Sequence, residues 1–512
     1  MTTPPPPGYL GAEGPVATGP SEALVDAGYQ LEIDDAPLLH RGLGIADLAH
    51  VAELHELTIL PSTDAVALTR ALLELLDTPA AGFPYEPAYG DAYNSRERVL
   101  ADRLGAAAGW LPTGRTRREA GRIAFRLALR TALLDLHAAV VDLGATLADR
   151  AIEHAGTVWN DTTYLQPAQP SSFGHYLGGF AEQVTRDLER IAGAHRWADR
   201  SPAGTGGVAG TTIPLDRDRL ARRLGFAAPG AHSRDAMWSV DGLTDALVAA
   251  TQAVLTADRL AEDLEIFASP QFGYVTLSGG SSRASVLLPQ KRNPYALAVI
   301  RGGAGTLIGR TTGSMVTQRT PSARTDNWLY AYGEVLRGVG LATRLVVLAA
   351  DVVATLQIER DALATSAGAD FSGAADLTER LVLDHGLDYR SAYRIVGRAV
   401  VRALDDERAR LRTEDLTGAA DDLGLELDGH VAATIAVLAD VRALVAGRNA
   451  VGGSAPARVA EHGAAVRATI AAAREWADQA RATARRAERD VVATARALVA
   501  GRQAGGRRCP PG

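Results

Sequence analysis

The chain has 512 residues, a formal net charge of -7 at pH 7, 47% hydrophobic residues and 22% charged residues. This composition is that of a globular protein, and the acidic balance argues against a protein that coats nucleic acid. The single cysteine, Cys509, excludes a disulfide framework and a thiolate metal site, and it leaves no plausible cysteine nucleophile.

Lysine usage is the most unusual feature of the composition. All but one of the 53 Lys and Arg residues are arginine, and the exception is Lys291. A compact ammonium and a planar guanidinium are not interchangeable where donor geometry matters. Because the chain otherwise uses arginine for positive charge, Lys291 is the first candidate for a functional residue.

The N-terminal part of the chain predicts a leader followed by short helices. Residues 1–20 are rich in proline and glycine and have neither a charged nor an apolar signal region, so they predict a disordered leader. Residues 21–118 hold shorter helical patterns and predict an N-terminal helical domain.

Long helical patterns dominate residues 119–359, which we predict to be a central helix-bundle domain. Apolar residues recur there at spacings of three and four, which is typical of amphipathic helices. The segments are 122–143, 171–198, 240–268, 293–318 and 327–358. Helices of this length span about 40 Å. The fold class predicted is therefore all-α, and Phe272–Leu277 is a short strand candidate.

The C-terminal part predicts a second small helical domain over residues 360–480, and a C-terminal helix and tail over 481–512. A run without Gly or Pro from 464 to 500 predicts one more long helix. No uninterrupted apolar run reaches the about 18–20 residues that a membrane span needs. We therefore expect no membrane association and a location in the cytoplasm.

The stretch 279–294 (GGSSRASVLLPQKRNP) is the strongest local signal for chemistry. Its Gly/Ser-rich loop runs into Lys291 and Asn293, and Pro294 stands at an expected helix start. Backbone N–H groups and a helix N-terminus favour bound negative charge. The loop therefore predicts an anion site, against the alternative of an ordinary capped loop with a surface lysine. The 11 histidines show no metal-ligand spacing, so no metal is predicted.

The run from Ser285 to Pro294 resembles the signature loop of the fumarase/aspartase superfamily. Three further blocks, 113–117, 163–170 and 204–212, resemble those of argininosuccinate lyase. Because the blocks occur in the family's order over roughly residues 40–480, the sequence is identified as an argininosuccinate lyase-like member of this superfamily.

The resemblance implies a homotetramer with a superhelical core of long helices, and active sites that are each shared among three chains. It implies a cofactor-free β-elimination from a substituted succinate that gives fumarate through a carbanion. Ser285 matches the catalytic base, and Lys291 matches a residue that holds the developing carboxylate charge. Substrate binding is expected from residues in the same blocks: Thr116, Arg117, Arg118, Thr163, Gln290 and Asn293.

Departures from the family's pattern concentrate on the amine side of the site. The family has His at Tyr164 and, to orient it, Glu at Ala298, so both members of that pair are replaced. Tyr164 can still act as an acid or a positioning residue, although a phenol is a weaker acid than an imidazolium. Further differences lie at Tyr93, Ser95, Arg118 and the block 321–326.

This pattern predicts a lyase that releases an amine-type group other than arginine, or a small anion such as nitrite, from a 2-substituted succinate. The setting expected for such an enzyme is specialised metabolism. Two alternatives stay open from the sequence. One is authentic argininosuccinate lyase, and the other is a catalytically silent structural tetramer.

Overall fold

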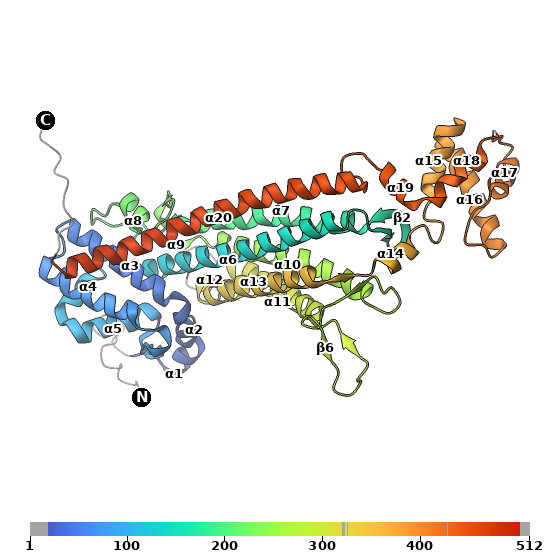
Figure 1. The fold of residues 1–512 in the computed structure, drawn as a ribbon. Coiled ribbons are helices and arrows are strands. Elements are labelled where there is room, and N and C mark those ends of the chain that lie inside the picture. Colours follow the sequence, from blue (N-terminus) through green and yellow to red (C-terminus); the bar gives the residue numbers. More distant parts are fainter. Residues whose placement is uncertain (1–18, 320–322, 325, 428, 502–512) are drawn as a thin grey trace, which may run out of the picture.

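The computed structural model describes residues 19–319, 323–324, 326–427 and 429–501. The predicted leader therefore lies almost wholly outside the described residues, as do Cys509 and part of the block 321–326. The described chain is an elongated bundle of long helices with a smaller helical region at each end (Figure 1). This architecture confirms the predicted all-α fold.

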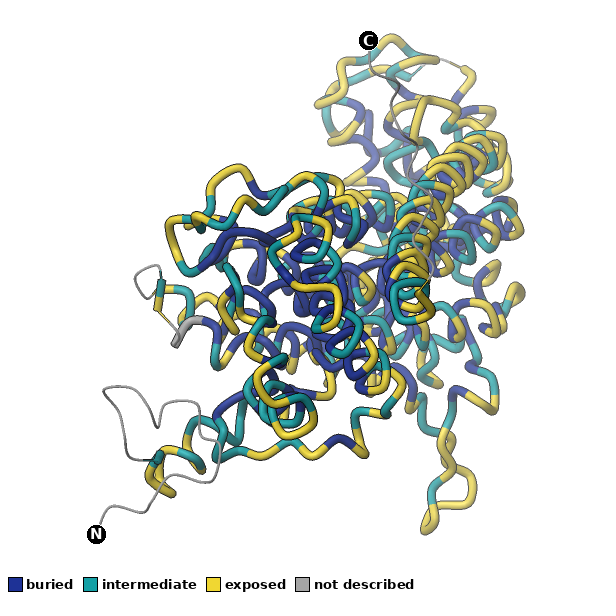
Figure 2. The backbone as a smooth tube through the Cα atoms, turned by 90° about the vertical axis from the view of Figure 1, so that its left-hand side faces the viewer, coloured by how far each residue is buried: buried dark blue, intermediate teal, exposed yellow. Residues whose placement is uncertain are grey.

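Six long helices form the body of the molecule. They are α6 (Arg117–Glu153), α7 (Phe173–Ala198), α10 (Asp241–Phe267), α11 (Tyr295–Gln318), α13 (Tyr332–Thr355) and α20 (Pro456–Val499). Helix α6 packs against α7, α13 and α20, and α10 packs against α7, α11 and α13. Figure 2, which looks along the bundle, shows the buried residues gathered in its interior. Their apolar members are mostly Leu, Ala and Val.

Helix α6 extends beyond the pattern predicted for it, 122–143, at both ends. Thr116 caps its start, because its hydroxyl oxygen accepts a hydrogen bond from the Glu119 amide at 3.2 Å. The helix then continues through Gly144, where an added Cβ would lie 2.6 Å from Ile470 and 2.7 Å from Val184. The glycine therefore allows α20 and α7 to approach α6 closely.

The N-terminal segment packs directly on the bundle. It contains α1 (Glu22–Leu24), α2 (Gln30–Asp34), α3 (Ala36–Glu56), α4 (Ser62–Asp77) and α5 (Ala92–Leu104). Apolar side chains of α3, α4 and α5 belong to the same buried cluster as those of α6 and α10. The boundary predicted between residues 118 and 119 falls inside the first turn of α6.

The C-terminal region has its own small core. Its helices are α14 (Arg360–Ser366), α15 (Ala374–His385), α16 (Tyr389–Asp405), α17 (Thr413–Asp421), α18 (Val431–Ala436) and α19 (Val441–Gly447). Leu377, Ile395 and Leu416 lie in a cluster separate from that of the bundle. Helix α20 then returns along α6 and α7, so the boundary predicted between 480 and 481 cuts through one continuous helix. The helix begins at Pro456 rather than at 464, because it continues through Gly463, where an added Cβ would lie 2.6 Å from Ile152, and proline is well accommodated in its first turn.

Strands are few and short among the described residues. The longest pair, β1 (Val158–Thr163) and β2 (Gln166–Ser172), forms an antiparallel hairpin between α6 and α7 that the sequence patterns did not predict. The predicted strand 272–277 is reduced to β5 (Val275–Thr276), which pairs with β8 (Gln357–Ile358). A third pair, β6 (Arg283–Ala284) and β7 (Arg292–Asn293), carries the signature loop.

Two helices, α6 and α13, are long and apolar enough to cross a membrane by length and composition. The sequence predicted no membrane-spanning segment because it contains no long uninterrupted apolar run. That prediction is wrong for α6 and α13, which reach the required length and mean hydropathy although polar residues interrupt them. Core helices of globular proteins pass the same test, and α6 and α13 pack against each other in the bundle. They are bundle helices of this fold.

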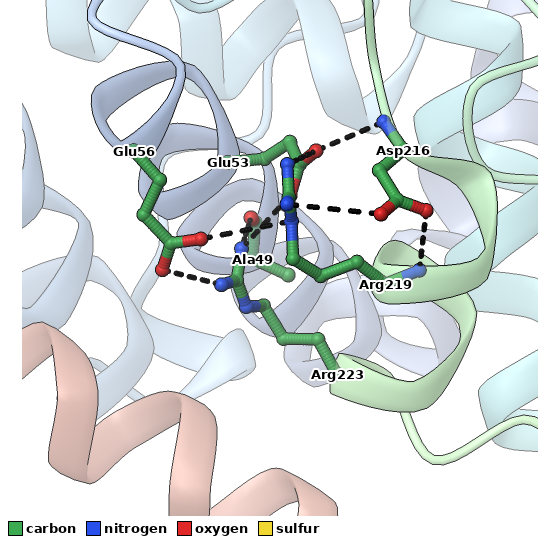
Figure 3. A network of polar contacts seen from close by, with 6 residues as sticks. All are labelled: Ala49, Glu53, Glu56, Asp216, Arg219 and Arg223. Carbon is green, nitrogen blue, oxygen red and sulfur yellow. Dashed lines mark hydrogen bonds and ion pairs between the residues drawn. The ribbon is translucent and has the colours of Figure 1, made fainter. Parts of the chain in front are cut away.

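A buried carboxylate ties α3 to the short helix α8 (Arg217–Arg223). Figure 3 shows Arg219 and Arg223 reaching from α8 to Glu53, whose side chain is fully buried. Arg219 donates to the two carboxylate oxygens at 2.6 and 2.7 Å, and the Asp216 amide donates at 3.0 Å. Glu56, which is half-exposed, pairs with Arg223 at the edge of this network.

Removing the charge of Glu53 should destabilise the fold. We expect Glu53→Gln to lower the free energy of unfolding by about 3 kcal/mol, because it leaves two arginines without their buried partner. The matched variant Glu56→Gln removes a solvent-screened pair and should cost less than about 1 kcal/mol. Urea denaturation of both variants measures the difference, and equal losses would contradict this account.

Candidate active site

The first candidate block lies at the N-terminal end of α6, beside a cleft of about 520 Å³. Thr116 and Arg117 line this cleft, together with side chains of α5 and of the turns before it. Arg117 donates to the Asp91 carboxylate at 2.5 Å and remains exposed. A guanidinium that is held through one terminal nitrogen and is otherwise exposed is suited to bind a substrate carboxylate.

Arg118 is differently placed. Its guanidinium donates to both carboxylate oxygens of Glu32, at 2.6 and 3.1 Å, and the pair is mostly buried. Burial opposes its charge, and the Glu32 carboxylate outweighs that effect, so the pKa of Arg118 is raised. The substrate role predicted for Arg118 would therefore require this ion pair to open.

The same cleft holds a carboxylate that the sequence analysis did not single out, Glu97 on α5. Burial raises the pKa of Glu97, and the nearby Asp47 carboxylate adds to the effect. No described residue forms an ion pair with Glu97. The cleft is therefore lined by two arginines, the exposed Arg117 and the buried Arg115 that is paired with Asp47, and by one carboxylate without a paired cation.

A second missed residue, Glu119, joins two of the candidate blocks. Its buried carboxylate accepts hydrogen bonds from the backbone amides of Gly204 at 2.7 Å and Gly206 at 2.6 Å. Both glycines have positive φ, a conformation that favours glycine. Thr116 donates to the Gly206 carbonyl at 3.4 Å. Glu119 thus fixes the loop 204–210 against the start of α6.

The environment of Glu119 opposes its ionisation. Burial raises the pKa of its carboxyl to about 7, although the two amide donors and the nearby cations Arg115 and Arg217 lower it. The spacing Thr-x-x-Glu at 116–119 is the pattern of a helix capping box, which was a signal available in the sequence. In the structure, Thr116 does cap the helix, but Glu119 turns away from it to bind the glycine loop.

The second block forms the tip of the β1–β2 hairpin beyond the other end of α6. Thr163 is exposed there, and the Tyr164 side chain is 99% exposed with φ at 55°. In this chain Tyr164 is therefore not in contact with the Thr116 cleft. Helix α6, with 37 residues, separates the two blocks by about 55 Å.

The remaining candidate residues lie on the signature loop between β6 and β7, which projects from the body of the bundle (Figure 1). The Ser285 hydroxyl oxygen accepts a hydrogen bond from the Leu288 amide at 3.0 Å. Asn293 donates from its side chain to the Arg283 carbonyl at 3.0 Å and thereby closes the loop. Gln290 and Lys291 are exposed near its tip, beside the fully exposed Val286.

The described residues contain no group of three or more His, Cys, Asp or Glu side chains that could hold a metal ion. What the structure brings together is therefore a loop with a hydroxyl, an ammonium and an amide, and, elsewhere, a cleft with a guanidinium and a carboxylate. The structure of one chain keeps the cleft and the hairpin tip apart.

Comparisons with known proteins show the family to which the chain belongs. Residues 41–309 match the Lyase family. Argininosuccinate lyase of Methanoculleus marisnigri is 33% identical over 438 residues, which cover 85% of this chain and 88% of that protein. The chain therefore belongs to this lyase family, within the fumarase/aspartase superfamily. Its sequence places it among the argininosuccinate lyase-like members.

Solved structures of the superfamily share the fold. EDDS lyase in complex with formate superposes with a TM-score of 0.83 at 23% identity, over 93% of this chain and 96% of that chain. A variant of EDDS lyase with bound fumarate gives 0.84 over the same shares. Class II fumarase of Schistosoma mansoni gives 0.66 at 15% identity, over 82% of this chain and 93% of that chain.

The contact between Glu119 and the glycine loop leads to a prediction that needs no substrate. We expect Glu119→Gln to accelerate hydrogen exchange of the Gly204 and Gly206 amides about ten- to hundredfold, because each amide donates to a different carboxylate oxygen and an NH2 donor replaces one of these oxygens in glutamine. Hydrogen exchange with mass spectrometry over residues 203–211 measures this. The matched variant Glu97→Gln should leave the rate unchanged, and unchanged rates in both variants would count against the role of Glu119.

Proposed function

We propose that the protein is a lyase that eliminates an amine from an N-substituted succinate and forms fumarate. The observation that carries the proposal is the signature loop, which keeps Ser285, Lys291 and Asn293 at the superfamily's spacing. A relative, argininosuccinate lyase, is named for an elimination of this class, and a structural neighbour, EDDS lyase, has been solved with bound fumarate. We keep the cytoplasm as its proposed location.

The proposed chemistry starts with proton removal from the carbon next to a substrate carboxylate. Ser285 takes the proton, and the Leu288 amide that donates to its oxygen stabilises the anionic form of the serine. Negative charge then spreads onto the carboxylate, where Lys291 and Asn293 act as preorganised donors. The carbanion expels the group on the neighbouring carbon, and Thr163 and Tyr164 orient or protonate that group. No cofactor takes part in this proposal.

Glu97 favours an amine over a small anion as the leaving group. Its carboxylate stands in the Thr116 cleft without a paired cation among the described residues and is partly shielded from water. Glu97 attracts a positively charged amine, whereas Arg117 in the same cleft attracts a substrate carboxylate. The charge of Arg115 is balanced by Asp47. This charge distribution supports release of an amine.

The length of α6 supports a site assembled from several chains. One end of α6 carries the Thr116 cleft, and the other end, about 55 Å away, leads to the Thr163 hairpin. Helix α11 also exposes an open face of small residues, where an added Cβ would meet no atom within 4 Å: Gly302, Gly305, Gly309 and Gly313. Beside it, Ile308, Met315 and Val316 are exposed. We propose that these faces pack in a homotetramer, with each site shared among three chains.

Two rival functions remain to be separated from this one. Authentic argininosuccinate lyase is disfavoured by Tyr164 and Ala298, which replace the His–Glu pair of that family. A silent structural tetramer is disfavoured by Lys291, since a site without a function gives no reason to keep the one lysine of the chain.

The function is tested by mixing the protein with fumarate and a panel of amines, with ammonia and nitrite included. We expect loss of the ultraviolet absorbance of fumarate with at least one amine and none with nitrite. Lys291→Arg and Ser285→Ala should each lower kcat/KM about a hundredfold or more, because each removes a group that acts in the transition state.

The control for Lys291→Arg is Arg489→Lys, an equally conservative change at an exposed position of α20. It should keep the activity within about twofold. If argininosuccinate is cleaved with a higher kcat/KM than every other substituted succinate tested, the protein is an authentic argininosuccinate lyase instead. If no compound of the panel reacts with fumarate and argininosuccinate is not cleaved, the proposed lyase function is contradicted.

The shared site is tested by mixing two inactive variants, Lys291→Arg on the loop and Arg117→Met in the cleft. Random exchange of subunits in equal amounts leaves about a quarter of the sites with both parts intact. We therefore expect the mixture to regain about a quarter of the wild-type activity. Mixing Lys291→Arg with Ser285→Ala, both on one loop, should give no recovery. Recovery in neither mixture would mean that loop and cleft act within one chain.

A further inference from the structure

A second cavity, of about 460 Å³, lies between α20 and the side of the bundle formed by α6, α7 and α8. One face of α20 lines it, with residues spaced three and four apart from Trp476 to Asp490. Helix α20 lies across the bundle from α11, the helix with the open glycine face (Figure 1). Along α6, the cavity is centred on Arg130, about 20 Å from Thr116. It is therefore separate from the cleft described above.

Arg130 forms the inner wall of this cavity and is almost fully buried. One terminal nitrogen donates to the Gly225 carbonyl at 2.6 Å, and Nε lies 3.1 Å from Asp199 Oδ1. Its plane lies over Phe226, with the guanidinium carbon 4.7 Å from the ring centroid. The other terminal nitrogen, Nη1, has no hydrogen-bond partner. Nε also has no hydrogen-bond partner, although it is ion-paired with Asp199, so the arginine is held at Gly225 and Asp199 with donors left unused.

Aromatic rings form the adjoining wall. His195 and Trp476 line the cavity with ring centroids 5.4 Å apart, and His137, behind this wall, lies 5.1 Å from the indole centroid without lining the cavity. His195 Nε2 and His137 Nδ1 have no hydrogen-bond partner. Burial lowers the pKa of both histidines to about 4, so each is neutral at pH 7. A neutral imidazole supplies one donor and one acceptor.

Several unpartnered buried polar atoms at one place call for a partner, because such atoms are rare in folded proteins and costly to leave unpaired. The rim of the cavity adds two exposed arginines, Arg222 and Arg486, for which no described residue forms an ion pair. Asp199 and Asp490 also line the cavity, and Asp199 is the partner of Arg130. Three arginines against two aspartates leave the lining with a net positive charge.

We propose that this cavity is a binding site for a small organic or inorganic anion whose carboxylate or phosphate is bound by Arg130 Nη1 and His195 Nε2. Arg222 and Arg486 attract the anion at the rim, and Trp476 covers its apolar part. A volume of about 460 Å³ is in the range of metabolite sites. This site is independent of the proposed lyase chemistry.

The probes are inorganic phosphate and citrate, titrated separately into the full-length protein in a buffer without either anion. Binding is followed by tryptophan fluorescence and by calorimetry. We expect at least one probe to give a saturable signal, and the fluorescence change to vanish in Trp476→Phe. Which probe binds more tightly decides between phosphate and carboxylate as the head group. Absence of saturation with both probes would overturn the proposal.

The location is tested at the rim, because a change of buried Arg130 would also release Gly225 and Asp199. The double variant Arg222→Ala/Arg486→Ala should raise the dissociation constant about tenfold or more, since it removes two charges that face the anion. Arg489→Ala, a charge of the same helix that does not line the cavity, should leave it unchanged. Equal binding in the double variant and in this control would overturn the proposed site.

Discussion

The rigid length of α6 is the constraint on which the rest of the structure depends. Thirty-seven helical residues hold the Thr116 cleft and the Thr163 hairpin at opposite ends of the bundle. Neither end can fold toward the other, because α7, α13 and α20 pack along the helix between them. Residues whose motif positions imply a common site therefore meet only if chains associate. The chemistry proposed for this protein therefore depends on the association of its chains.

The interior of α6 contains three arginines whose role a lysine could not fill. Arg122, Arg126 and Arg130 follow one another at four-residue spacing and point into the bundle, where each guanidinium lies on an aromatic ring. The guanidinium carbon of Arg122 is 3.5 Å from the centroid of Trp328. A planar, weakly hydrated guanidinium tolerates such burial, whereas an ammonium does not stack. The remaining ammonium, Lys291, is by contrast exposed on a loop.

Much of the fold could be predicted from the sequence because long helices leave a strong periodic pattern. The bundle helices and the signature loop were both expected, and the helices are confirmed. The C-terminal end of α6 and the start of α20 were missed, because the predicted runs stop at Gly144 and Gly463, and both glycines lie inside helices where they allow close packing. The β1–β2 hairpin was missed because its exposed tip has no alternation of apolar residues.

The candidate site was less predictable, since contacts between distant residues decide it. The ion pair of Arg118 with Glu32 joins positions 86 residues apart, and no local pattern announces it. Glu119 showed the pattern of a capping box, but the loop at 204–210 competes for its carboxylate. Positions such as Ser285 and Lys291 could be named from a motif, whereas the partners proposed for them on other chains leave no trace in the order of one sequence.

A structure of the purified protein with bound fumarate tests the central claim most directly. The account predicts a tetramer in which fumarate lies between Lys291 and Asn293 of one chain, Arg117 of a second chain and Thr163 of a third. A monomer, or fumarate bound by residues of a single chain with the Thr116 cleft empty, would contradict it.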